Sequence, residues 1–152
     1  MNSKMKLVAF LAIAAVAAAG LAAQGILPRL CCVAGEYTGS HILDPLPNCP
    51  APASESFTMS LYQETGCGAK VWGKIVDRAG NVREFKGTLS LGPRGCCKFT
   101  ASFSDPHPVG HVIEMTGLFC RVAGKWGAKG TYKEINSGDP CRKTGTWHIR
   151  RI

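Results

Sequence analysis

Residues 71–103 read VWGKIVDRAGNVREFKGTLSLGPRGCCKFTASF, which is three alternating runs separated by two turn signals. The runs cover residues 71–77, 82–91 and 97–103, with apolar and polar side chains on alternate positions. Such alternation is typical of a strand that buries one face. The pair Gly80-Asn81 tolerates a positive φ, which predicts a tight hairpin between the first two runs. The stretch therefore predicts consecutive antiparallel strands.

The same alternation continues on both sides of this stretch. Further runs cover residues 37–43, 56–64, 112–121, 125–135 and 144–152. No segment after residue 23 shows the sustained period of 3.6 residues that an amphipathic helix requires. Strands that close on themselves leave no exposed sheet edge to invite aggregation. We therefore expect an all-β fold, an antiparallel meander of about eight strands in a closed barrel, with a two-sheet sandwich as the alternative.

An apolar segment precedes the alternating runs. Lys4 and Lys6 are followed by residues 7–23, which carry no charged or polar side chain. This layout is typical of a secretory signal peptide. We expect residues 1–23 to be an N-terminal apolar export helix, residues 24–35 a lead-in, and residues 36–152 the barrel domain. A retained membrane anchor is the alternative, because the segment matches the short end of the roughly 17–25 residues that span a bilayer.

All eight cysteines lie after this segment, and an even number in an exported chain predicts a disulfide framework. They are Cys31, Cys32, Cys49, Cys67, Cys96, Cys97, Cys120 and Cys141. Neighbouring side chains on a strand face opposite ways, so Cys96 and Cys97 should bond to different partners. A vicinal bond within one adjacent pair is the alternative. The framework places the protein in the periplasm or outside the cell, or on the periplasmic face of the inner membrane if the anchor is retained.

Composition and the absence of known motifs exclude several classes of function. The chain of 152 residues suits one domain, and its 45% of hydrophobic residues is enough for a core, which excludes global disorder. It has no nucleophile elbow, zinc-protease, P-loop or dinucleotide-binding motif, so we expect no enzyme and no cofactor. Removal of residues 1–23, with Lys4 and Lys6, lowers the net charge from +8 to a modest +6, and export separates the protein from nucleic acid, so we expect no nucleic-acid partner.

Histidines are the remaining chemical candidates. His107 and His111 are four residues apart, in a proline-rich segment that excludes a regular helix. We expect two exposed loop histidines and no metal site, with a loop chelate as the weaker alternative. If the protein were an enzyme, Glu114 facing inward near His111 would be the candidate acid or base.

Two short motifs resemble a known barrel family. Gly35-Glu-Tyr37 and Gly145-Thr-Trp147 are similar to the first and last strands of lipocalin-like barrels of the calycin type. The resemblance implies a small exported barrel with room for an apolar cavity, and it carries over no ligand. The chain departs from classical lipocalins in its eight cysteines, in having Tyr37 where tryptophan is usual, and in lacking a helix before the last strand.

Two sets of residues are candidates for binding. Inward-facing apolar residues that could line a cavity are Phe57, Met59, Leu61, Phe85, Leu89, Phe99, Phe103, Trp126, Tyr132 and Trp147. Basic residues that could form one outer patch are Lys125, Lys129, Lys133, Arg142, Lys143, Arg150 and Arg151. An eight-stranded barrel either fills its interior with side chains or holds one small ligand.

The sequence thus predicts an exported, non-enzymatic binding or accessory protein that meets a small apolar ligand or a protein partner. The alternative is a membrane-anchored accessory subunit of a larger complex on the periplasmic side, which contacts acidic partners through the basic patch. Contact with a membrane is expected only if residues 7–23 are retained.

Overall fold

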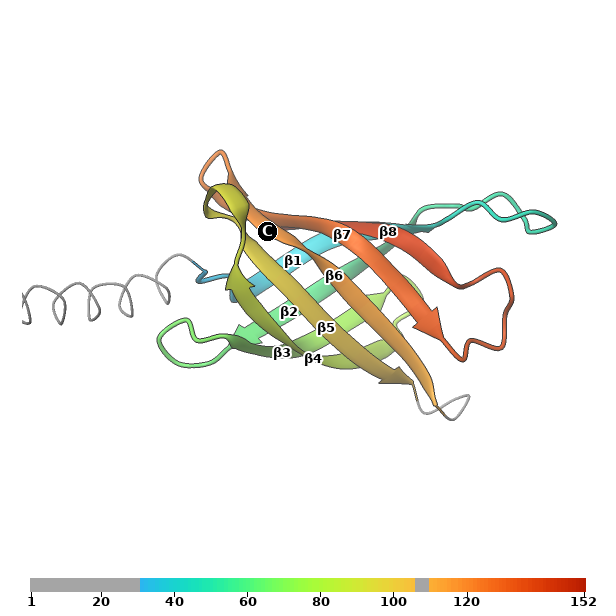
Figure 1. The fold of residues 1–152 in the computed structure, drawn as a ribbon, viewed down its shortest axis with the longest axis horizontal. Coiled ribbons are helices and arrows are strands. Elements are labelled where there is room, and N and C mark those ends of the chain that lie inside the picture. Colours follow the sequence, from blue (N-terminus) through green and yellow to red (C-terminus); the bar gives the residue numbers. More distant parts are fainter. Residues whose placement is uncertain (1–30, 106–109) are drawn as a thin grey trace, which may run out of the picture.

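The computed structural model describes residues 31–105 and 110–152, in which eight strands form one closed barrel (Figure 1). The strands are β1 (Gly35–Leu43), β2 (Glu55–Gln63), β3 (Lys70–Asp77), β4 (Val82–Leu91), β5 (Cys97–Asp105), β6 (His111–Val122), β7 (Lys125–Ile135) and β8 (Thr144–Arg151). Each strand pairs antiparallel with the next, and β8 pairs with β1. The predicted closed meander is confirmed, and the sandwich alternative is wrong because every strand has two paired neighbours.

Helix is nearly absent from the described residues, where a single turn, η1 (Pro93–Gly95), precedes β5. No helix in these two ranges is long and apolar enough to cross a membrane. The export helix predicted in residues 1–23, and residues 24–30 of the lead-in, lie outside the described residues.

The predicted hairpin joins β3 and β4 through residues 78–81. Gly80 has a φ of 87°, and its backbone N–H donates to the Asp77 carbonyl oxygen at 3.0 Å. The Asp77 carboxylate accepts two further hydrogen bonds from Asn81, one from the backbone N–H at 2.9 Å and one from the side-chain amide at 2.8 Å. These bonds favour the ionised acid and lower the pKa of Asp77 below its ordinary value of 3.8.

Replacing Asp77 with Asn is expected to lower the melting temperature at neutral pH. Because the folded state favours the carboxylate, its stabilisation is present above pH 3.8 and is lost as the pH falls through the lowered pKa of the folded protein. Thermal melts at neutral pH and at about pH 2 should therefore show a gap between wild type and variant that closes in acid. A gap of the same size at both pH values would contradict this role for Asp77.

Aromatic side chains fill one part of the barrel interior. Phe99 makes edge-to-face contacts with Phe119, Trp147 and Phe85, at centroid distances of 5.4, 5.9 and 6.2 Å. Tyr37 in turn contacts Phe119 at 5.6 Å. Such contacts add to the stabilisation from burial alone. In this part the barrel is a packed core rather than an open tube.

A pair of glycines lies beside Trp147, the largest of these side chains. Gly117 of β6 and Gly130 of β7 are directly paired. A Cβ atom at Gly117 would lie 2.6 Å from Cζ2 of Trp147, and one at Gly130 would lie 1.8 Å from the Thr116 carbonyl oxygen. The indole of Trp147 therefore packs against the bare backbone of Gly117, and its Nε1–H donates to the Thr131 carbonyl oxygen at 3.0 Å.

The end of the barrel at which β1 begins is closed by residues 31–34. Val33 is fully buried, and its backbone N–H donates to Oε1 of Gln63 at 3.0 Å. The Gln63 amide donates in turn to the Cys31 carbonyl oxygen at 2.7 Å. The Tyr37 hydroxyl donates to the Val33 carbonyl oxygen. These bonds make the lead-in segment part of the core.

Disulfides connect both ends of the barrel. Three lie at the closed end, Cys31–Cys97, Cys32–Cys67 and Cys96–Cys120, and the fourth, Cys49–Cys141, joins loop 44–54 to loop 136–143 at the opposite end. The predicted framework of four bonds is confirmed. Cys96 and Cys97 bond to different partners, as do Cys31 and Cys32, so the vicinal alternative is wrong. Four disulfides indicate an oxidising environment, since cytosolic thiols are kept reduced.

Candidate functional site

A cavity of about 500 Å³ lies at the barrel end opposite the closed one, where loops 44–54 and 136–143 extend at the right of Figure 1. Because neighbouring strands are antiparallel, the last residues of β1, β3 and β7 meet the first residues of β2, β4 and β6 there. The apolar wall consists of Phe57, Ile75, Phe103, Ile113 and Met115. A volume of this size falls within the range of roughly 300–1,000 Å³ that is usual for small-molecule sites.

Charged and ionisable side chains line the mouth of the cavity. They are Glu55, Asp77, Glu134 and Asp139, the guanidinium groups of Arg83 and Arg142, and the imidazoles of His41 and His111. With neutral histidines, four carboxylates and two guanidinium groups give the cavity a formal charge of −2, whereas the whole chain carries +8. The cavity therefore concentrates negative charge in a basic protein.

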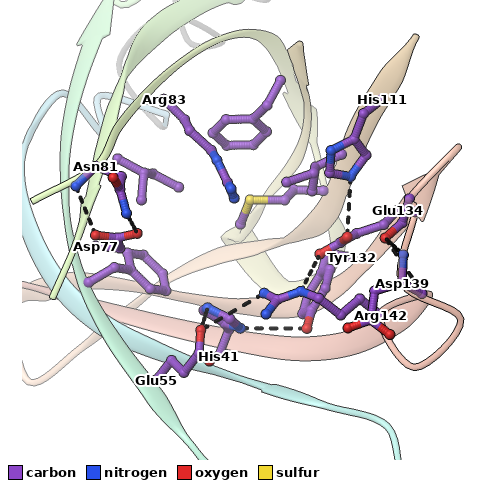
Figure 2. Close-up of a pocket in the computed structure, with 17 residues that line it drawn as sticks. His41, Glu55, Asp77, Asn81, Arg83, His111, Tyr132, Glu134, Asp139 and Arg142 are labelled. Carbon is purple, nitrogen blue, oxygen red and sulfur yellow. Dashed lines mark hydrogen bonds and ion pairs between the residues drawn. The ribbon is translucent and has the colours of Figure 1, made fainter. Parts of the chain in front are cut away.

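A buried acid on β7 organises one side of the mouth. Oε2 of Glu134 lies 3.2 Å from Nε2 of His111, and both side chains are buried. Oε1 of Glu134 lies 3.7 Å from Nε of Arg142. The Nη2 atom of the same arginine lies 3.9 Å from Oε2 of Glu55. Figure 2 shows His111, Glu134, Arg142 and Glu55 joined in sequence, so one guanidinium group bridges acids from β7 and β2.

His41 continues this network from β1. Its Nε2 lies 3.3 Å from Oε2 of Glu55, and its Nδ1 lies 3.5 Å from the Tyr132 hydroxyl. Burial is the largest influence on His41 and lowers the pKa of its imidazole, while nearby Glu55 acts in the opposite direction. The imidazole is therefore neutral at neutral pH, and its Nδ1 accepts a hydrogen bond from the Tyr132 hydroxyl.

Tyr132 remains a hydrogen-bond donor over the whole physiological range. Burial, followed by the negative charge of Glu134, raises the pKa of its hydroxyl to about 12. The hydroxyl is therefore protonated wherever the protein is folded near neutrality. Together with His41 it offers polar contacts next to the apolar wall, which is an arrangement that can orient a small amphiphilic molecule.

The predicted cavity residues divide into two groups. Phe57, Phe103 and Tyr132 line the cavity. The other seven are buried in the filled part of the interior: Met59, Leu61, Phe85, Leu89, Phe99, Trp126 and Trp147. Sequence reasoning missed Ile75, Ile113 and Met115. It also missed every ionisable group of the mouth as a cavity residue.

The expectation for His111 was wrong, and the inward-facing alternative for Glu114 is not realised. His111 is not an exposed loop residue: it is the first residue of β6 and is buried against Glu134. Glu114 does not face inward, because it lies on the outer face of β6, paired in register with Lys133. The buried acid near His111 is Glu134. Its signal in the sequence is its position two residues after Tyr132, on the same strand face.

The predicted basic residues also lie in different places. Lys125, Lys129 and Lys133 are exposed on β7, Arg150 and Arg151 are exposed on β8, and Lys143 is exposed in the preceding loop. Arg142 lies in the cavity mouth instead. Register places Arg150 opposite Gly127, between Lys125 and Lys129 along β7.

His107 lies outside the described residues, so they do not test the alternative of a loop chelate by His107 and His111. Within residues 31–105 and 110–152, no group of three or more histidine, cysteine or acidic side chains is placed to hold a metal ion. The mouth network thus contains two histidine–carboxylate pairs, His41 with Glu55 and His111 with Glu134.

Comparison of the chain with models of known protein families, with curated proteins and with solved structures found no match. The closed eight-stranded barrel is compatible with the lipocalin-like fold that the two terminal motifs resemble. Membership of that family stays a prediction.

Proposed function

We propose that this chain is an exported, non-enzymatic binding protein that holds one small amphiphilic ligand at the open end of its barrel. The observation that carries the proposal is the cavity of about 500 Å³, which combines an apolar wall with a ring of hydrogen-bonded ionisable groups. The wall favours the apolar body of a ligand through burial, and the ring supplies the few polar contacts that fix its orientation.

The rest of the molecule supports this function. The filled core and three disulfides hold the closed end, and the cavity walls belong to strands that are paired on both sides in the closed barrel. Preformed walls lower the entropic cost of binding. All eight cysteines are in disulfides, so none of them offers the thiolate that cysteine enzymes need. The oxidising environment that these bonds imply agrees with export.

A neutral aromatic dye, N-phenyl-1-naphthylamine, is expected to bind the protein with 1:1 stoichiometry and increased fluorescence. Replacing Met115 with Trp should lower its affinity by at least about tenfold, because the larger side chain fills the cavity whose wall Met115 forms. The control is Thr116→Trp, one residue further along β6, which faces outward and should leave the affinity unchanged.

Fluorescence titration of the three proteins measures both affinity and stoichiometry. Equal loss of affinity in the two variants would place the dye on the outer surface. No saturable binding to the wild-type protein would overturn the proposed function.

A further inference from the structure

We infer that the natural ligand carries a cationic nitrogen, such as a primary amine, which lies between Glu55 and Glu134 while its apolar body lies against Phe57, Phe103 and Met115. This inference rests on the proposed function and names the ligand class for the same cavity. It follows from which of the four carboxylates at the mouth are bound within their own loops and which can contact a ligand.

Two of the four carboxylates have local structural roles. Asp77 accepts both hydrogen bonds from Asn81 and interacts with the positive charge of Arg83. Oδ1 of Asp139 accepts from the Cys141 backbone N–H at 2.8 Å, within the loop that the disulfide to Cys49 holds. Figure 2 shows Asp77 and Asn81 on the side of the cavity away from Glu134. The acids left to meet a ligand are Glu55 and Glu134.

These two acids share one permanent positive charge. Arg142 lies 3.7 Å from Glu134 and 3.9 Å from Glu55, so neither atom pair is at hydrogen-bond distance. His41 lies 3.3 Å from Glu55 but is neutral at neutral pH, since burial lowers its pKa. His111 contacts Glu134 from β6 at 3.2 Å and is the remaining ionisable group on this pair. Arg142 thus supplies one permanent positive charge to two acid side chains.

Burial makes the negative charge of these acids effective for binding. The Glu134 side chain is only 4% exposed, whereas that of Glu55 is 54% exposed at the rim. A carboxylate that is removed from water gains more from a nearby positive charge than an exposed one. A ligand ammonium group placed between the acids would add to the positive charge that Arg142 supplies. The rings of Phe57 and Tyr132 also line the cavity, and aromatic faces attract cations.

An anionic ligand would meet the opposite situation. Its charge would face four carboxylates, while both guanidinium groups already interact with those acids. The positive charge of the whole chain favours anions at long range, so a preference for cations has to arise inside the cavity. This contrast makes the inference testable with ligands of one length and three charges.

The test is displacement of N-phenyl-1-naphthylamine by octylamine, octan-1-ol and octanoate at neutral pH. Octylamine is expected to bind most tightly and octanoate most weakly, with at least about a tenfold difference between their dissociation constants. Glu134→Gln should abolish the preference for octylamine over octan-1-ol while retaining the affinity for octan-1-ol. Glu55→Gln, at the exposed rim, is the second variant in case Glu134→Gln does not fold. Glu114→Gln, on the outer face, is the matched control and should keep the full preference.

The outcomes separate this inference from the proposed function. If the dye binds but octylamine competes no better than octan-1-ol, or if octanoate competes best, the cationic ligand class is overturned and the binding function stands. If neither the dye nor any of the three compounds binds, the proposed function fails and the inference fails with it. If Glu114→Gln loses the preference as well, the selectivity comes from surface charge and the inference is overturned.

Discussion

Replacing Trp147 with Ala is expected to lower the free energy of unfolding by about 3–5 kcal/mol, the usual cost of truncating a large buried aromatic side chain. Trp147 is 2% exposed, contacts Phe99, and donates a hydrogen bond to the Thr131 carbonyl oxygen. Its neighbours on β6 and β7 are Gly117 and Gly130, which have no side chains that could move into the space. The cavity left by the indole would therefore stay open.

The matched control is Trp72→Ala on the outer face of β3. Trp72 is 45% exposed and stacks on Tyr62 of β2 at a centroid distance of 6.5 Å. Loss of this cross-strand pair should cost less than about 1 kcal/mol. Guanidinium denaturation followed by circular dichroism, without reductant, measures both variants. Equal losses for the two tryptophans would show that the interior is not packed around Trp147.

Removal of the Cys31–Cys97 bond is the second change with a large expected effect. The double variant Cys31→Ala, Cys97→Ala should lose about 2–5 kcal/mol of unfolding free energy. The bond closes a loop of 66 residues, and both cysteines are buried at the closed end of the barrel. It also fixes residues 31–34, whose Val33 completes the core. The unfolded chain gains freedom while the folded chain loses the attachment of its first segment.

The double variant Cys32→Ala, Cys67→Ala provides the comparison. Its bond closes a loop of 35 residues, so the loss of chain entropy is smaller and the destabilisation should be smaller too. Peptide mapping of unreduced wild-type protein should recover a fragment that links Cys31 to Cys97. A variant without Cys31 and Cys97 that is as stable as wild type, together with absence of that fragment, would refute this pairing.

The fold could be predicted because alternation reports directly on burial. Phe57, Met59 and Leu61 share a strand face in the sequence, and all three are buried in the barrel. Disulfide pairing could not be predicted in the same way. Cys31 meets Cys97 only because the starts of β1 and β5 lie at one end of a closed barrel. That information is in the register, which alternation does not contain.

The cavity could be predicted only in part, for a related reason. Alternation gives the face of a strand but not the depth of a residue along the barrel. Leu61 and Phe57 have the same face, yet only Phe57 lies at the open end. His41 and Glu134 have inward positions four residues after Tyr37 and two after Tyr132, respectively. Alternation identifies a strand face by its apolar residues, so it does not reveal polar residues that are buried there, each with a partner on another strand.

The uneven placement of the disulfides leaves the loops at the open end more tolerant of sequence change than the closed end. Three bonds secure the closed end, while loops 44–54 and 136–143 depend on the single link between Cys49 and Cys141. Substitutions and length changes in these loops leave the aromatic core and its crosslinks intact. The barrel is therefore suited to diversification, in which a library of new loops is displayed on an unchanged scaffold to select other specificities.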